Sequence, residues 1–137
     1  MELPDLYKHN LTSKEYFEKI VLTFPELESE IMTEDSEDVH YKMECFANYT
    51  IKQIIVSDWD ELKACFDFQE MHIQSLNPEL ENAIIVSFCE SLLLGEVSND
   101  MNMVMKYMGP LLTKKYKDYE EYYNDLVKKY NSSGNIS

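Results

Sequence analysis

Four prolines divide this chain at positions where a helix can begin or end, and only three glycines accompany them in 137 residues. None of the prolines falls inside an apolar pattern of helical spacing, where it would remove a backbone hydrogen bond. Asn77-Pro78 is the clearest boundary, because asparagine is favoured as an N-cap and a proline at the first helical position has no hydrogen bond to lose. The positions of these residues predict a chain that is helical nearly throughout.

Between these boundaries, apolar residues recur every three or four positions, as they do on the buried face of an amphipathic helix. Two capping-box patterns add start signals, Thr12 with Glu15 and Asp58 with Glu61. We predict helices over residues 12–24, 36–57, 58–74, 78–94, 101–108 and 111–130, with a short acidic helical turn over 26–31. A break in the last helix near Lys117-Asp118 is left open.

The predicted helices place most of the large apolar side chains on inward faces. Phe46, Phe66 and Phe88 lie on three different apolar stripes, and Ile54 and Ile55 continue the first of these stripes. The inward face of the last helix is expected to consist of Tyr119, Tyr123, Leu126, Val127 and Tyr130, with Tyr116 or Tyr122 exposed.

The length and composition are those of one domain. An apolar content of 45%, with ten tyrosines, six phenylalanines and one tryptophan, is enough to bury a core. Short connections make successive helices antiparallel neighbours. We therefore predict an all-α, single-domain antiparallel helical bundle over residues 1–130, or a short stack of helical hairpins of the HEAT or armadillo kind, followed by a polar tail over 131–137.

Acidic charge is concentrated in the middle of the chain. Residues 26–105 hold eighteen aspartates and glutamates against three lysines, a local charge of −15, whereas the whole chain carries −14. Such a field repels nucleic acid and anionic lipid and accelerates the approach of a basic partner. The charge therefore predicts a protein partner, with no nucleic acid and no membrane. It does not predict an oligomeric state.

The sequence offers no pattern typical of a metal site, a cofactor site or a catalytic site. Cys45, Cys65 and Cys89 have spacings that match neither a disulfide framework nor a zinc knuckle, so we expect reduced core thiols. His40 and Glu44 stand four residues apart on a predicted helix, but two ligands do not make a metal site. All twelve basic residues are lysines, which leaves no guanidinium to bind phosphate through two hydrogen bonds. We expect no metal, no cofactor and no enzymatic activity.

The compartment is predicted from the absence of export and membrane signals. The segment Met1-Glu2-Leu3-Pro4-Asp5 has neither the basic start nor the apolar stretch of a secretion signal, and no run of eighteen apolar residues occurs. We expect a cytoplasmic protein.

Two acidic groups are the candidate partner-binding residues. One is a predicted loop with Glu34, Asp35, Glu37 and Asp38, and the other surrounds Trp59 with Asp58, Asp60 and Glu61. A structural alternative applies to both groups, because carboxylates at helix starts also complement the helix dipole without any partner. Trp59 likewise has the alternative role of a packing residue.

Several landmarks in residues 46–112 resemble those of one protein family. They are Phe46-Ala47 with Tyr49-Thr50, Trp59 to Leu62 leading to Cys65 to Phe68, Asn82-Ala83 leading to Val86 to Glu90, and Gly109 to Leu112. The chain in these respects resembles an uncharacterised family of small, acidic, all-helical bacterial proteins. That family is similar in size, charge and gene neighbourhood to the immunity proteins of polymorphic-toxin and contact-dependent inhibition systems.

The resemblance implies a non-enzymatic protein that binds and neutralises a cognate bacterial toxin, which we expect to be a basic nuclease. It brings no catalytic residue with it. The alternative function is that of a helical-repeat adaptor, which binds an endogenous protein or peptide and whose acidity serves solubility.

Overall fold

The computed structural model describes residues 10–32 and 38–134, and within these ranges the chain is a helical bundle. The longer helices are α2 (Ser13–Thr23), α4 (Val39–Ile55), α5 (Trp59–His72) and α9 (Pro110–Gly134). The shorter ones are α3 (Glu28–Ile31), α6 (Pro78–Ala83), α7 (Glu90–Leu94) and α8 (Met101–Val104). The described residues also contain one isolated parallel β-bridge, between Leu11 and Leu76. The predicted all-α class is confirmed.

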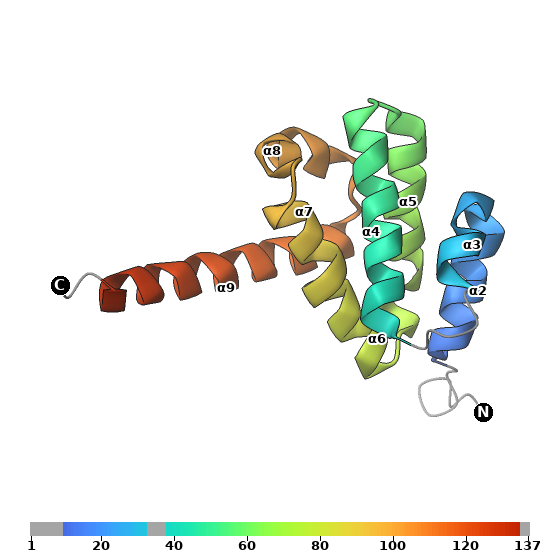
Figure 1. Cartoon of the computed structure of the whole chain (residues 1–137), viewed down its shortest axis with the longest axis horizontal. Helices are drawn as coiled ribbons and strands as arrows, with labels where there is room; N and C mark the ends of the chain where they lie inside the picture. The colour runs from blue at the N-terminus through green and yellow to red at the C-terminus, as the bar shows by residue number, and fades with distance from the viewer. Residues whose placement is uncertain (1–9, 33–37, 135–137) are drawn as a thin grey trace, which may run out of the picture.

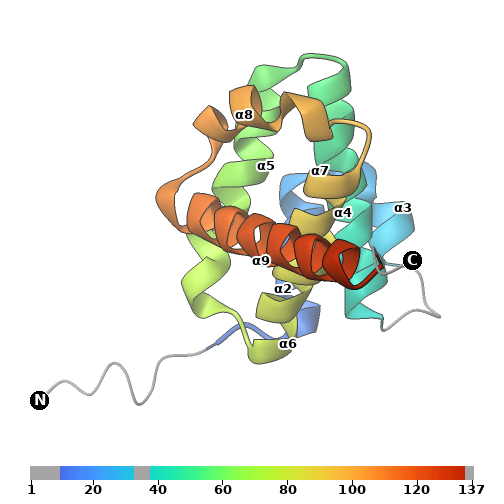
Figure 2. The same cartoon turned by 90° about the vertical axis from the view of Figure 1, so that its left-hand side faces the viewer.

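Helices α4 and α5 form a central hairpin (Figure 1). Helices α2 and α3 lie on one side of this hairpin, and a continuous helical segment from α6 through η3 (Ile84–Cys89) to α7 lies on the other. Helix α9 then runs across the bundle and extends beyond it (Figures 1 and 2). The segment containing η3 therefore lies between the hairpin and α9, and it contacts both.

The helix starts follow the capping signals in the sequence. Thr12 forms a complete capping box, in which its hydroxyl accepts from the Glu15 backbone N–H at 3.1 Å and the Glu15 carboxylate accepts from the Thr12 N–H at 2.9 Å. Asp58 caps α5 by accepting from the Glu61 N–H at 3.2 Å. Asn77 caps α6 by accepting from the Leu80 N–H at 2.8 Å. These side chains accept hydrogen bonds from backbone N–H groups in the first turn, which have no carbonyl acceptor within the helix.

Aromatic side chains form the centre of the core. The ring of Phe46 on α4 lies 5.3 Å from that of Phe24, 5.7 Å from that of Phe68 on α5, and 5.5 Å from that of Phe88 in η3, measured between centroids. All four rings are buried. Phe46 thus joins the two flanking layers to the central hairpin, and aromatic pairs at these separations add stabilisation beyond the area that they bury.

Two predictions about α4 need correction. The helix begins at Val39 and not near Ser36, because the Asp38 carboxylate accepts from the backbone N–H groups of His40 and Tyr41 and so caps the helix at that point. Ile55, predicted to face the core, is 54% exposed, whereas Ile51 one turn earlier is buried. The turn that follows α4 contains Ser57, which adopts the left-handed backbone conformation at φ 59°.

The last helix differs most from its prediction. Helix α9 shows no break near Lys117-Asp118 and continues through residues 131–134, which were predicted as tail. Tyr116 is buried, while Leu126 and Tyr130 on the expected inward face are exposed. The reason is tertiary: only the first part of α9 lies against the bundle, so the apolar face of its second part meets no core (Figure 1).

Candidate functional site

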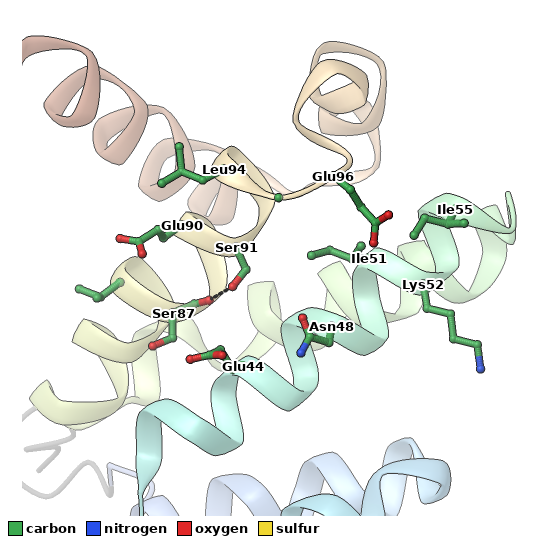
Figure 3. Close-up of a pocket in the computed structure, with 12 residues that line it drawn as sticks. Glu44, Asn48, Ile51, Lys52, Ile55, Ser87, Glu90, Ser91, Leu94 and Glu96 are labelled. Carbon is green, nitrogen blue, oxygen red and sulfur yellow. Dashed lines mark hydrogen bonds between the residues drawn. The ribbon is translucent and has the colours of Figure 1, made fainter. Parts of the chain in front are cut away.

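An open groove of about 570 Å³ lies between α4 and the segment from η3 to α7. Ile51 forms part of its buried floor, and the exposed side chains of Ile55, Val86 and Leu94 add apolar surface. Figure 3 shows Glu44, Asn48 and Ile51 of α4 across this groove from Ser87 and Ser91. The full lining consists of Glu44, Asn48, Ile51, Lys52, Ile55, Val86, Ser87, Glu90, Ser91, Leu94, Gly95 and Glu96.

Three carboxylates surround this apolar surface. Glu44 comes from α4, Glu90 from α7, and Glu96 from the segment that follows α7. Within the described ranges, none of the three forms an ion pair with a lysine. The one basic side chain in the lining, Lys52, points away from them in Figure 3. An acidic rim around apolar side chains suits a partner that combines cationic and apolar groups.

One of the three carboxylates is held by a contact with the last helix. Glu90 accepts a hydrogen bond from the Tyr119 hydroxyl of α9 at 2.5 Å. Burial, together with this hydrogen bond, raises the pKa of Tyr119 above its ordinary value. The phenol therefore stays protonated and donates its hydrogen bond to the Glu90 carboxylate, which connects this part of the groove lining to α9.

The helical segment that forms one wall of the groove contains an irregularity. Residues Ile84–Cys89 form a π-helix, in which backbone hydrogen bonds span one residue more than in an α-helix. Within it, the Ser87 hydroxyl lies 2.7 Å from Nδ1 of His40, and the Ser87 carbonyl accepts from the Ser91 hydroxyl at 2.6 Å. Segments of this kind are frequent at functional sites, and this one supplies Val86 and Ser87 to the groove.

His40 is one of the two residues that gave the weak metal signal in the sequence, and its Nδ1 atom is engaged by the Ser87 hydroxyl. His40 and Glu44 lie one turn apart on α4, but the described part of the chain contains no group of three side chains arranged to hold a metal ion.

The structure does not bring the predicted partner-binding residues together. Glu34, Asp35 and Glu37 lie outside the described residues. Asp38 and Asp58 flank opposite ends of α4, which at 1.5 Å per residue is about 26 Å long. Neither Asp38 nor Asp58 lines the groove.

Most of the described members of this predicted set make structural contacts. Asp38 and Asp58 cap helices, and the Glu61 carboxylate accepts from the Tyr49 hydroxyl. Trp59 is half-buried, and its ring stacks on that of Tyr107 with centroids 5.5 Å apart and planes 3° apart. Asp60 is exposed in the first turn of α5. Their role in partner binding stays a prediction.

The groove could have been found only in part from the sequence. The spacing of the residues places Glu44, Asn48 and Lys52 on the face of α4 opposite its core stripe, and Ile51 and Ile55 lie beside them at helical spacing. Apolar residues on both sides of a helix indicate a second surface besides the core. Which segment would face that surface depended on the position of α7, for which the sequence holds no local signal.

The three cysteines are buried and unpaired by disulfides. Burial raises the pKa of the Cys65 and Cys89 thiols to about 12 from the ordinary value of 9.0. A neutral, buried thiol is a poor nucleophile, so these two side chains behave as small core residues.

No helix in residues 10–32 or 38–134 is both long enough and apolar enough to cross a membrane.

The fold and the groove define an all-α helical-bundle domain with an acidic surface groove. The chain belongs to the family described as Domain of unknown function (DUF7674), whose model matches residues 17–124, from α2 into α9. No curated protein and no solved structure matches the chain.

Proposed function

We propose that this chain is a cytoplasmic immunity protein, without enzymatic activity, that binds and neutralises a basic bacterial toxin domain through the groove between α4 and α7. The observation that carries this proposal is the group formed by Glu44, Glu90 and Glu96, which has no lysine partner in the described structure and surrounds exposed apolar side chains. The local charge of −15 over residues 26–105 supports it. The resemblance in residues 46–112 suggests the class of partner.

The groove can contribute to affinity in two ways. Its carboxylates attract a basic surface over a distance of about 10 Å at moderate ionic strength and so raise the association rate. The apolar side chains of Ile55, Val86 and Leu94 then bury area against the partner and slow its dissociation. In a nuclease, the carboxylates of such a groove would pair with the lysines and arginines that otherwise bind nucleic-acid phosphate.

The direct test is affinity capture from the source lysate at low and at high salt, with the recovered proteins identified by mass. The variant Glu44→Lys/Glu96→Lys reverses two exposed charges of the groove. Its matched control, Glu18→Lys/Glu79→Lys, changes the net charge equally at exposed positions outside the groove. We expect a basic partner that is captured by the wild type and by the control, and that is lost from the groove variant and at high salt.

A second measurement tests neutralisation. Cells that produce the captured partner should survive with the wild-type chain and with the control variant, and should die with the groove variant. Survival with all three proteins would remove the groove from the proposal. A partner without toxicity would overturn the immunity function itself.

The apolar part of the groove also favours the second candidate function, an adaptor that binds an amphipathic helix of an endogenous protein. The capture experiment separates the two functions. An adaptor partner would resist high salt and carry ordinary charge, whereas a toxin partner would be basic and salt-sensitive.

A further inference from the structure

The second half of α9 exposes an apolar stripe where the helix extends beyond the bundle (Figure 1). Tyr122, Leu126 and Tyr130 are 60%, 48% and 77% exposed. They are spaced four residues apart and so share one face of the helix. Three large apolar side chains in a row on a projecting helix form a surface suited to another protein.

The charges on the same half of α9 are segregated along its axis. The acidic residues Glu120, Glu121 and Asp125 come first, and Lys128 and Lys129 follow. If two copies of this helix lie antiparallel, the basic end of each meets the acidic start of the other. A parallel pair would place like charges side by side. The charge pattern therefore favours a second copy of the same helix in the antiparallel direction.

A hollow at the base of the projecting half suits the end of that second helix. It has a volume of about 380 Å³ and is lined by Ile85, Val86, Lys115, Asp118, Tyr119 and Tyr122. Tyr130 lies eight residues beyond Tyr122, which is about 12 Å along the helix axis. In an antiparallel pair, Tyr130 of each copy would reach the hollow of the other.

We propose that the chain forms a symmetric dimer through antiparallel pairing of the second halves of two α9 helices, with Tyr130 of each copy seated in the hollow beside Tyr122 of the other. The contact is the same on both copies, as two-fold symmetry requires. The hollow shares one lining residue, Val86, with the groove between α4 and α7. The pairing rests on the apolar stripe and the charges of α9 itself, so it goes beyond the proposed function and does not depend on it.

The pairing is weak enough to be measured as an equilibrium. Two short helices bury less than the roughly 1,200 Å² typical of a stable interface, so we expect a dissociation constant in the micromolar range. Sedimentation equilibrium of the full chain from about 5 µM to about 500 µM should show a monomer that converts to a dimer. A chain that stays monomeric throughout this range overturns the proposal.

A pair of matched variants locates the contact. Leu126→Asp places a charge in the apolar stripe and should abolish the dimer over the whole range. Leu22→Asp makes the same change at another exposed leucine, which is 81% exposed on α2, and should leave the association unchanged. Circular dichroism checks that both variants keep their helical content. If Leu126→Asp associates like the wild type, α9 is not the contact.

Charge exchange tests the antiparallel direction. Lys128→Glu/Lys129→Glu makes the projecting half entirely acidic, and Glu121→Lys/Asp125→Lys makes it mainly basic. Each variant alone should associate at least about tenfold more weakly than the wild type, a difference of about 1.4 kcal/mol. An equimolar mixture should recover a heterodimer. If the mixture stays as weakly associated as its components, the charge pattern does not direct the pairing.

Discussion

Gly109 and Glu70 are in such close contact that a Cβ atom added to the glycine would lie 2.3 Å from Cδ of the glutamate. The same Glu70 carboxylate accepts from the backbone N–H groups of Leu111 and Leu112, at 2.9 and 2.8 Å. Glu70 belongs to α5, so a side chain from another helix performs the role of an N-cap for α9. Its negative charge also complements the positive end of the α9 dipole.

This arrangement predicts that substitutions at the two positions are coupled. Glu70→Ala removes two charge-assisted hydrogen bonds and should lower the free energy of unfolding by about 1–3 kcal/mol. Gly109→Ala should cost a similar amount, because the new methyl group displaces the carboxylate from the two N–H groups. In the Glu70→Ala background, Gly109→Ala should therefore cost much less. Urea unfolding of the four proteins in the cycle measures the coupling, and strictly additive effects would contradict it.

A buried polar contact in the core predicts a second double-mutant cycle. The Tyr16 hydroxyl donates to Oε1 of Gln69, and Nε2 of Gln69 lies 3.5 Å from the sulfur of Met43. Tyr16→Phe leaves a buried amide oxygen without its donor and should destabilise the fold by about 1–3 kcal/mol. Tyr16→Phe/Gln69→Leu removes both partners and should cost less than the two single changes together. Thermal and urea unfolding measure the three losses of stability. If the double variant loses as much free energy of unfolding as the two single variants together, or more, the result would argue against the contact.

The capping and partner roles of the acids beside Trp59 can be separated. Asp58→Ala removes the cap of α5 and should lower the free energy of unfolding by about 1 kcal/mol. Asp60→Ala changes an exposed carboxylate in the same turn and should alter stability by less than about 0.5 kcal/mol. The two variants have equal net charge, so each is the other's control in a binding experiment. If Asp60→Ala slows capture of the partner without loss of stability, the predicted acidic group belongs to the interface.

Buried thiols and phenols predict loss of stability in alkali. In the folded chain burial raises the pKa of the Cys65 and Cys89 thiols to about 12, whereas their ordinary value is 9.0. Between these two values the folded state binds more protons than the unfolded state, so stability is complete below pH 9 and decreases as pH rises towards 12. Each such thiol contributes up to about 1.4 kcal/mol per pH unit. Burial raises the pKa of Tyr16 in the same direction.

Urea unfolding at pH 8 and at several values up to pH 11 measures this decrease. Cys89→Ala is the control, since it removes one of the two thiols and should make the dependence on pH less steep, whatever it does to stability at pH 8. A free energy of unfolding that stays constant up to pH 11 would contradict the prediction.

Local signals predicted the starts of α2, α5 and α6 correctly. Thr12, Asp58 and Asn77 cap helices with their own side chains, and the partners lie within three residues along the chain. Interactions of that range depend little on the rest of the fold. The start of α9 lacks such a signal, because its cap comes from Glu70, 41 residues before Leu111.

The inward faces of the helices were predicted best where helices pack on all sides. Phe46, Phe66 and Phe88 are fully buried, as their apolar stripes indicated. The same periodicity on α9 predicted a buried face that the structure leaves exposed at Leu126 and Tyr130. An apolar stripe indicates that a helix face is suited to packing. It does not indicate whether that face packs within the chain or against a partner.

The sequence by itself determined the helical class, the helix starts with local caps, the aromatic core and the strong negative charge, because these depend on neighbours within one or two helical turns or on composition alone. Only the tertiary structure decided that α4 and α7 enclose an acidic groove, that Asp38 and Asp58 lie at opposite ends of a helix, and that half of α9 projects from the bundle. These features arise from the packing of segments far apart in the chain. Such packing is determined by the shapes of whole helices and not by any short pattern of residues.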